Sequence, residues 1–124
     1  MDTIDNFNQL FLTLLQEIQL ITKDNLINVF YNKMIDMVKN DRNYLIKNHY
    51  QDFLKYKSII FNDKIKLLNE LNLTIYKINL NLIWKKLNDT NKHTLIDYLQ
   101  AITYLAQKYK EIYIDNDNIF IKKL

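Results

Sequence analysis

The chain contains neither glycine nor proline in 124 residues. Glycine supplies positive-φ turns and close backbone approach, whereas proline supplies rigid turns and ends helices. A chain without both residues must turn with other side chains, and we expect it to be mostly helical.

The length fits a single domain spanning residues 1–124. Hydrophobic residues make up 48% of the chain and charged residues 25%, which is a globular balance. A chain of this size buries roughly two-thirds of the surface that its unfolded form exposes, so its core can stabilise the fold without a disulfide or a structural metal. Cysteine is absent, so neither a disulfide nor a thiolate site is expected.

Asn-Asp pairs are predicted to mark the helix boundaries that glycine and proline usually mark. Asn is the best residue after glycine for the left-handed position that ends a helix, and Asp is a good N-cap for the next one. The alternative is chance in a chain rich in both residues. The four pairs are Asn40-Asp41, Asn62-Asp63, Asn88-Asp89 and Asn116-Asp117.

Apolar residues recur at spacings of three and four along most of the chain, which predicts amphipathic helices. The expected helices cover about residues 5–21, 24–39, 41–57 and 91–113, with a further helix from Asp63 and a short one after Asn79. In the second of these, Thr22 is the expected cap and Leu26 is expected to face inward. Residues 72–79 are read as an extended linker. Residues 113–124 are read as an extended tail or a small hairpin.

These elements predict an all-α, single-domain bundle of five to six mostly antiparallel helices with a short extended C-terminal segment. The predicted core consists of Phe7, Phe11, Leu14, Phe30, Met34, Phe53, Leu68, Trp84, Leu99, Ile102 and Ala106.

Signals of catalysis are nearly absent. P-loops, dinucleotide fingerprints and nucleophile elbows all need glycine, so none of them can exist here. Ser58 is the one serine, and it reads as a linker hydroxyl. His93 and Asp97 are spaced as neighbours on a helix, but a metal site needs more ligands, and His49 reads as a packing residue. The run 115–118 resembles the start of a calcium loop but has Phe120 where that loop needs glycine. We expect a non-enzymatic protein with no cofactor, metal or catalytic residue.

A protein partner or self-association is the expected mode of action. Leu12 and Leu20 point away from the main stripe of the first helix, and Tyr104 lies off the stripe of the last helix. Exposed large apolar residues that gather mark an interface. The alternative is that they form a second buried face of a compact bundle.

Nucleic-acid binding is the second hypothesis. The formal net charge is +3, and all of it falls in residues 63–124. That excess is mild for a nucleic-acid binder. Lysines interleave with aromatic residues, a pattern suited to phosphates and stacked bases. The candidate contacts are Lys47, Lys55, Lys57, Lys85 and Lys86, and they support this hypothesis only if they converge on one surface.

No run of eighteen apolar residues is present, so we expect no membrane-spanning helix. The chain begins with the acidic segment Met1-Asp2-Thr3-Ile4-Asp5, which is unlike a secretory signal. The expected location is a soluble, intracellular one.

The C-terminal half carries the segment Asn81-Leu82-Ile83-Trp84-Lys85-Lys86-Leu87, then Asn91-Lys92, then Tyr98-Leu99-Gln100. With the Phe/Leu-rich first helix, this pattern resembles small helical proteins of unknown function from giant, nucleocytoplasmic large DNA viruses. The chain departs from that pattern at Leu95-Ile96, where Ile-Trp is expected. The resemblance covers about two-thirds of the chain and implies a viral accessory or virion-associated protein in the host cytoplasm or the virion. It brings no assigned chemistry.

Overall fold

The computed structural model describes residues 2–61, 74–75 and 78–115 of the chain. The fold is all-α, as the sequence predicted, and six α-helices of the described ranges pack in a single bundle. The elements are α1 (Thr3–Thr22), α2 (Asn25–Asn40), α3 (Tyr44–Lys55), α4 (Lys57–Phe61), α5 (Leu80–Lys86), α6 (Asp89–Tyr109) and a π-helical extension of α6, η2 (Lys110–Asp115).

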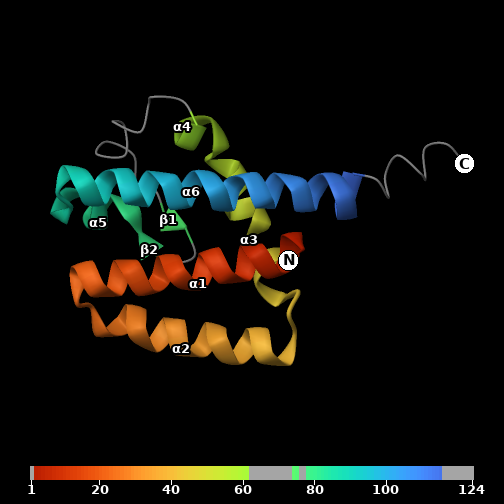
Figure 1. The fold of residues 1–124 in the computed structure, drawn as a ribbon, viewed down its shortest axis with the longest axis horizontal. Coiled ribbons are helices and arrows are strands. Elements are labelled where there is room, and N and C mark those ends of the chain that lie inside the picture. Colours follow the sequence, from red (N-terminus) through yellow and green to blue (C-terminus); the bar gives the residue numbers. More distant parts are fainter. Residues whose placement is uncertain (1, 62–73, 76–77, 116–124) are drawn as a thin grey trace, which may run out of the picture.

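Three long helices run side by side in the order α2, α1, α6 (Figure 1). Helix α1 runs antiparallel to both of its neighbours in this row. Helices α3 and α4 pack on α6, and α3 also contacts α1 and α2. Helix α5 lies by the beginning of α6. The central place of α1 means that most of its circumference is covered by other helices.

Helix α1 shows why the sequence folds in this way. The Asp2 carboxylate accepts a hydrogen bond of 2.8 Å from the amide of Asp5, which caps the first turn. The stripe that contains Phe7, Phe11 and Ile18 is buried along the whole helix. The helix ends at Lys23, which has φ 55° and ψ 29°, the left-handed conformation that glycine usually adopts.

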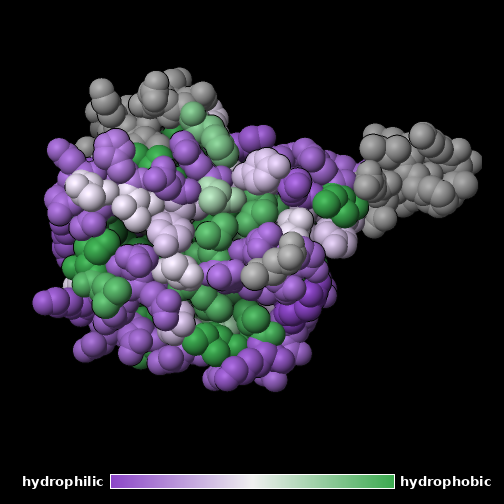
Figure 2. Space-filling model, viewed as in Figure 1, coloured by the Kyte–Doolittle hydropathy of each residue, from purple (hydrophilic) through white to green (hydrophobic). Residues whose placement is uncertain are grey.

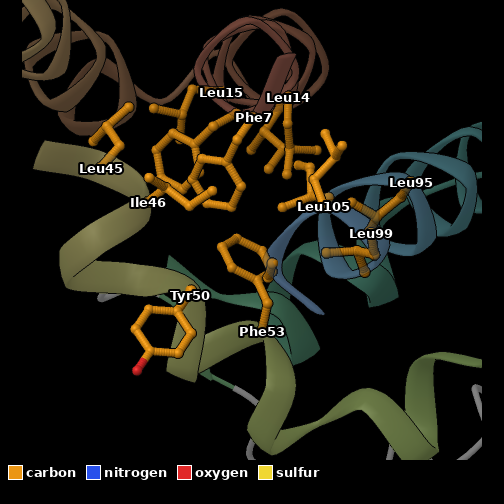
Figure 3. Packing of buried hydrophobic residues seen from close by; sticks show 14 of the residues in the cluster. Phe7, Leu14, Leu15, Leu45, Ile46, Tyr50, Phe53, Leu95, Leu99 and Leu105 are labelled. Carbon is orange, nitrogen blue, oxygen red and sulfur yellow. The ribbon is translucent and has the colours of Figure 1, made fainter. Parts of the chain in front are cut away.

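The core is built around Phe53 of α3 (Figure 3). Its ring meets Phe7 edge-on at 5.8 Å between centroids and Phe11 edge-on at 6.1 Å. Edge-to-face contacts of this kind add to the free energy gained by burying the rings. Leu99 and Leu105 of α6 line the same interior.

Most of the predicted core is confirmed. Phe30 is only partly buried, and Leu68 lies outside the described residues. Leu26, which was predicted to face inward, is 76% exposed. Helix α2 lies at the edge of the bundle, so its buried strip is narrow and holds only Ile27 and Met34. The predicted residues that are buried are Phe7, Phe11, Leu14, Met34, Phe53, Trp84, Leu99, Ile102 and Ala106.

The Asn-Asp pairs in the described residues do mark helix boundaries, but the predicted mechanism is wrong. Asn40 was predicted to be left-handed, but it is the last helical residue of α2 and does not have a positive φ, and Asp41 after it is extended. Asn88 is the N-cap of α6, and its side chain accepts from the amide of Asn91 at 2.8 Å. Both pairs therefore use side-chain oxygens near helix starts, because Asp41 likewise accepts from the amide of Asn43. The other two pairs include residues outside the described ranges.

Other boundaries shift by a few residues. The predicted helix over 41–57 is divided at Tyr56 into α3 and α4. Thr22 does not cap α2, because Asp24 does so through the amide of Leu26 at 2.9 Å. The sequence placed 113–115 in an extended tail, but the structure places them in η2, while 116–124 lie outside the described residues. The helix predicted to begin at Asp63 also lies outside them.

The extended segment before α5 is confirmed in part. Two short strands, β1 (Thr74–Ile75) and β2 (Ile78–Asn79), pair antiparallel with Ile75 opposite Ile78. The sequence alone indicates no partner for a strand here, but the structure pairs the two ends of this segment with each other. The Asn79 side chain then accepts from the amide of Leu82 at 3.4 Å, which fits its predicted role at the start of α5.

The left-handed residue gives a direct stability test. We expect Lys23→Gly to raise the free energy of unfolding by up to about 1 kcal/mol, because glycine adopts this conformation without steric cost. The matched control is Lys33→Gly at an exposed position inside α2, which should lower the free energy by about 1 kcal/mol. Urea denaturation measures both. Changes of the same sign in the two variants would contradict the left-handed assignment.

Asn40 and Asn88 were predicted to play the same role, but the structure predicts different effects on stability when each is replaced by alanine. Asn88→Ala should lower the free energy of unfolding by about 1 kcal/mol, because the cap of α6 is lost. Asn40→Ala should be nearly neutral or slightly stabilising, because Asn40 is an exposed helical residue. Thermal denaturation followed by circular dichroism compares them, and equal losses would count against the capping role of Asn88.

Candidate functional site

A groove runs between α1 and α6 on the face of the bundle seen in Figure 2. It is a shallow, open groove with a volume of about 480 Å³. Hydrophobic side chains are visible in the middle of this face, between the two helices. The groove is lined by Asn6, Gln9, Leu10, Thr13, Tyr98, Ala101, Tyr104 and Leu105.

The spacing of residues on the two helices creates this hollow. On α1, Asn6, Gln9 and Thr13 recur at three and four residues on the side opposite the buried stripe. On α6, Ala101 stands between Tyr98 and Tyr104, each three residues away. The small side chain of Ala101 between two larger rings leaves the depression, and Leu105 forms its buried floor.

No charged side chain lines the groove among the described residues, although a quarter of the chain is charged. Depletion of charge and enrichment of tyrosine are typical of the buried centre of protein interfaces. Tyr104 is 56% exposed, and the ammonium of Lys108 lies 5.4 Å from the centroid of its ring. The groove is chemically suited to apolar and aromatic side chains, with amides and hydroxyls at its rim for hydrogen bonds.

The three residues predicted for a protein interface do not lie together in this groove. Tyr104 lines it. Leu20 is 67% exposed near the end of α1 and does not line it. Leu12 is half-buried against the core, which is the alternative that the sequence left open for it. Leu10, Tyr98, Ala101 and Leu105 were missed; the one signal in the sequence is the lone alanine between two tyrosines.

The five predicted nucleic-acid lysines are all exposed, but they form separate groups. The Lys55 ammonium lies 5.4 Å from the centroid of Tyr56, and that of Lys57 lies 3.5 Å from Oε1 of Gln107. Lys85 and Lys86 end α5, at the opposite end of α6. Trp84 of that helix contacts Lys92.

The distance between the Lys57 group and the Lys85–Lys86 group can be judged from the residues of α6 that each group lies beside. Lys92 and Gln107 are separated by fifteen residues of α6, or about 22 Å at 1.5 Å per residue. Lys47 lies on α3, eight residues before Lys55, which ends that helix. Binding by these lysines stays a prediction, and it requires a ligand long enough to follow α6.

Arg42 is paired with two carboxylates. Its guanidinium donates to Asp2 at 2.6 Å and to Asp5 at 3.1 Å. The hydrogen bond to Asp2 raises the pKa of Arg42, and the pKa of Asp2 is lowered by its bonds to the Asp5 amide and to Arg42. The backbone carbonyl of Arg42 accepts from the buried side chain of Asn8 at 2.8 Å. Together these bonds hold the turn between α2 and α3 (residues 41–43) against the start of α1.

His49 is a packing residue, as the sequence suggested. Its ring stacks on Phe11 at 6.4 Å, and its Nδ1 lies 3.3 Å from the carboxylate of Asp52. Burial lowers the pKa of His49 below its ordinary value of 6.5, and Asp52 opposes that shift. His93 and Asp97 are both exposed on α6. In the described part of the chain, no group of three or more His, Cys, Asp or Glu side chains is placed to hold a metal ion.

Among the described residues, no helix is both long and apolar enough to cross a membrane. Comparisons with known proteins add no identity, since no family model, curated protein or solved structure matches this chain.

His49 predicts a pH dependence of stability. The unfolded chain takes up a proton near pH 6.5, whereas the folded chain takes it up only at lower pH, so the unfolded state binds more protons in between. The free energy of unfolding should therefore fall as pH drops from 7.5 to 5.5. Asp52→Asn should steepen the fall, because the carboxylate that favours the charged ring is gone.

Urea denaturation at the two pH values measures this effect. The control is His49→Phe, which keeps an aromatic ring in place and should lose less stability over the same pH interval. An equal loss in the wild type and in His49→Phe would contradict the role of His49.

Proposed function

We propose that the protein acts by binding other proteins through the groove between α1 and α6, and not by catalysis. The observation that carries the proposal is an uncharged groove containing a tyrosine that the bundle leaves more than half exposed. This is the role of a structural or accessory component. With the giant-virus resemblance of the sequence, it corresponds to a viral accessory or virion-associated protein in the host cytoplasm or the virion.

The energetics favour occupation of the groove. Covering the exposed part of Tyr104 removes on the order of 100 Å² from water, which contributes about 2 kcal/mol. Leu10 is half-buried in the same hollow and adds to this gain. Among the described residues no charged side chain lines the groove, but the Lys108 ammonium lies 5.4 Å from the centroid of the Tyr104 ring. A partner that covers Tyr104 must therefore leave that ammonium in contact with water or pair it with an anion.

The shape of the site favours a helical partner. Two long antiparallel helices form a trough along which a third helix can lie, as amphipathic helices do in hydrophobic grooves. Ala101 provides a hollow for one large side chain of such a partner. The hydroxyl, amide and phenol groups at the rim can bond to its polar face.

A test compares the proteins captured by the tagged wild type and by Tyr104→Glu. The glutamate places a charge in the groove, so we expect capture of the specific partner to fall at least about tenfold. Leu26→Glu is the matched control, because Leu26 is an exposed apolar residue of α2 outside the groove. This control should retain the partner. Equal capture by Tyr104→Glu and the wild type would contradict the groove as the binding site.

The same preparations test the basic-module alternative. Recovery of only DNA or RNA, released by salt, would reverse the proposal in favour of a nucleic-acid-binding helical module. In that case, replacing Lys55 and Lys57 by Glu should weaken binding and reduce its dependence on salt. Binding that does not change with salt concentration would exclude the alternative.

A further inference from the structure

We propose that the partner in the groove is a second copy of this chain, in a symmetric dimer whose two α6 helices cross antiparallel. The two-fold axis passes between Ala101 and Tyr104. This inference rests on the proposed function, because it names the occupant of the same groove.

The outer face of α6 carries the argument. Asp97, Ala101, Tyr104 and Lys108 follow one another at spacings of four, three and four residues, so they share one face of the helix. Asp97, Tyr104 and Lys108 are exposed, and Ala101 is half-buried. An acidic side chain, a small one, a large one and a basic one therefore stand in a row along this face.

This row is complementary to itself when it is reversed. In a two-fold interface every contact occurs twice: if residue i of one copy contacts residue j of the other, then residue j of the first copy contacts residue i of the second. An antiparallel register that places Tyr104 over Ala101 of the second copy also places Asp97 opposite Lys108. It does so because Asp97 precedes Ala101 by four residues and Lys108 follows Tyr104 by four. One register thus matches both size and charge.

A parallel pairing of the same faces does not give this match. It would bring Asp97 against Asp97 and Lys108 against Lys108, which like-charge repulsion disfavours. It would also place the two Tyr104 rings together and leave both Ala101 hollows unfilled. The sequence of side chains on α6 therefore selects the antiparallel arrangement.

Helix α1 is compatible with the same dimer. Its outer residues beside the groove are Asn6, Gln9 and Thr13, which carry no charge. These three residues therefore add no like-charge contact between the two copies. The α1 and α6 helices of the two copies would then form a four-helix arrangement.

The available area is sufficient for a specific dimer. Helices of 20 and 21 residues are about 30 Å long, and two of them side by side are about 20 Å wide. This face offers roughly 600 Å² on each copy, or about 1,200 Å² in total, which is at the lower end for specific interfaces. We expect a dimer that dissociates at micromolar concentrations.

Sedimentation equilibrium of charge-swap variants tests the register. Asp97→Lys and Lys108→Asp each create two like-charge contacts in the dimer, and each should raise the dimer dissociation constant about tenfold. The variant with both substitutions restores opposite charges at both places. Its dissociation constant should return to within about threefold of the wild-type value.

The controls separate the interface from the fold. Asp36→Lys makes the same change of charge on the exposed side of α2 and should leave the dissociation constant unchanged. Ala101→Glu fills the hollow with a charge and should abolish the dimer. Circular dichroism checks that every variant retains its helices.

Two results would overturn the inference: a wild-type protein that stays monomeric at about 100 µM, and a double variant that stays as weak as the single ones. If the wild type is monomeric but Tyr104→Glu still loses a captured protein, the dimer is refuted and the proposed function stands. If the wild type dimerises with the expected charge dependence and captures no other protein, self-association is itself the protein contact made by the groove.

Discussion

The fold depends on the contact of Phe53 with Phe7 and Phe11, where α3 meets α1. All three rings are buried, and α6 closes the same interior with residues such as Leu99 and Ile102. Helix α1 also packs against α2 and α6, so among the described residues one face of α1 stays uncovered. The groove exists because that remaining face of α1 stands beside the outer face of α6.

A chain without glycine and proline still has to turn, and it does so with polar side chains at helix starts. Asp2, Asp24 and Asn88 each accept a backbone amide in the first turn of a helix. One non-glycine residue, Lys23, adopts the left-handed conformation in the described part of the chain. Arg42 adds long-range ion pairs between the α2–α3 turn and the carboxylates at the start of α1. The caps and the left-handed residue supply local constraints that glycine or proline often provides, whereas the Arg42 ion pairs act between distant parts of the chain.

The groove joins the proposed function and the proposed dimer through one residue pair. Ala101 leaves a hollow, and Tyr104, one turn further along α6, presents a ring of the size that fills such a hollow. A helix that carries both can bind another copy of itself, provided that the copy runs in the opposite direction. Asp97 and Lys108 at the two ends of this pair favour that direction, so specificity would come from the charges and affinity from the packing.

The helical periodicity determined the all-α class, most of the buried core and the position of most helices, because burial follows the angle of each side chain around its own helix. It also indicated Tyr104 correctly as lying off the buried stripe. Periodicity alone did not show which neighbour covers that off-stripe side. Leu12 and Leu26 show this, since Leu12 meets the core whereas Leu26 stands at an uncovered edge. The groove needs α1 and α6, which are far apart in the chain, to lie together, and only the tertiary packing decided that.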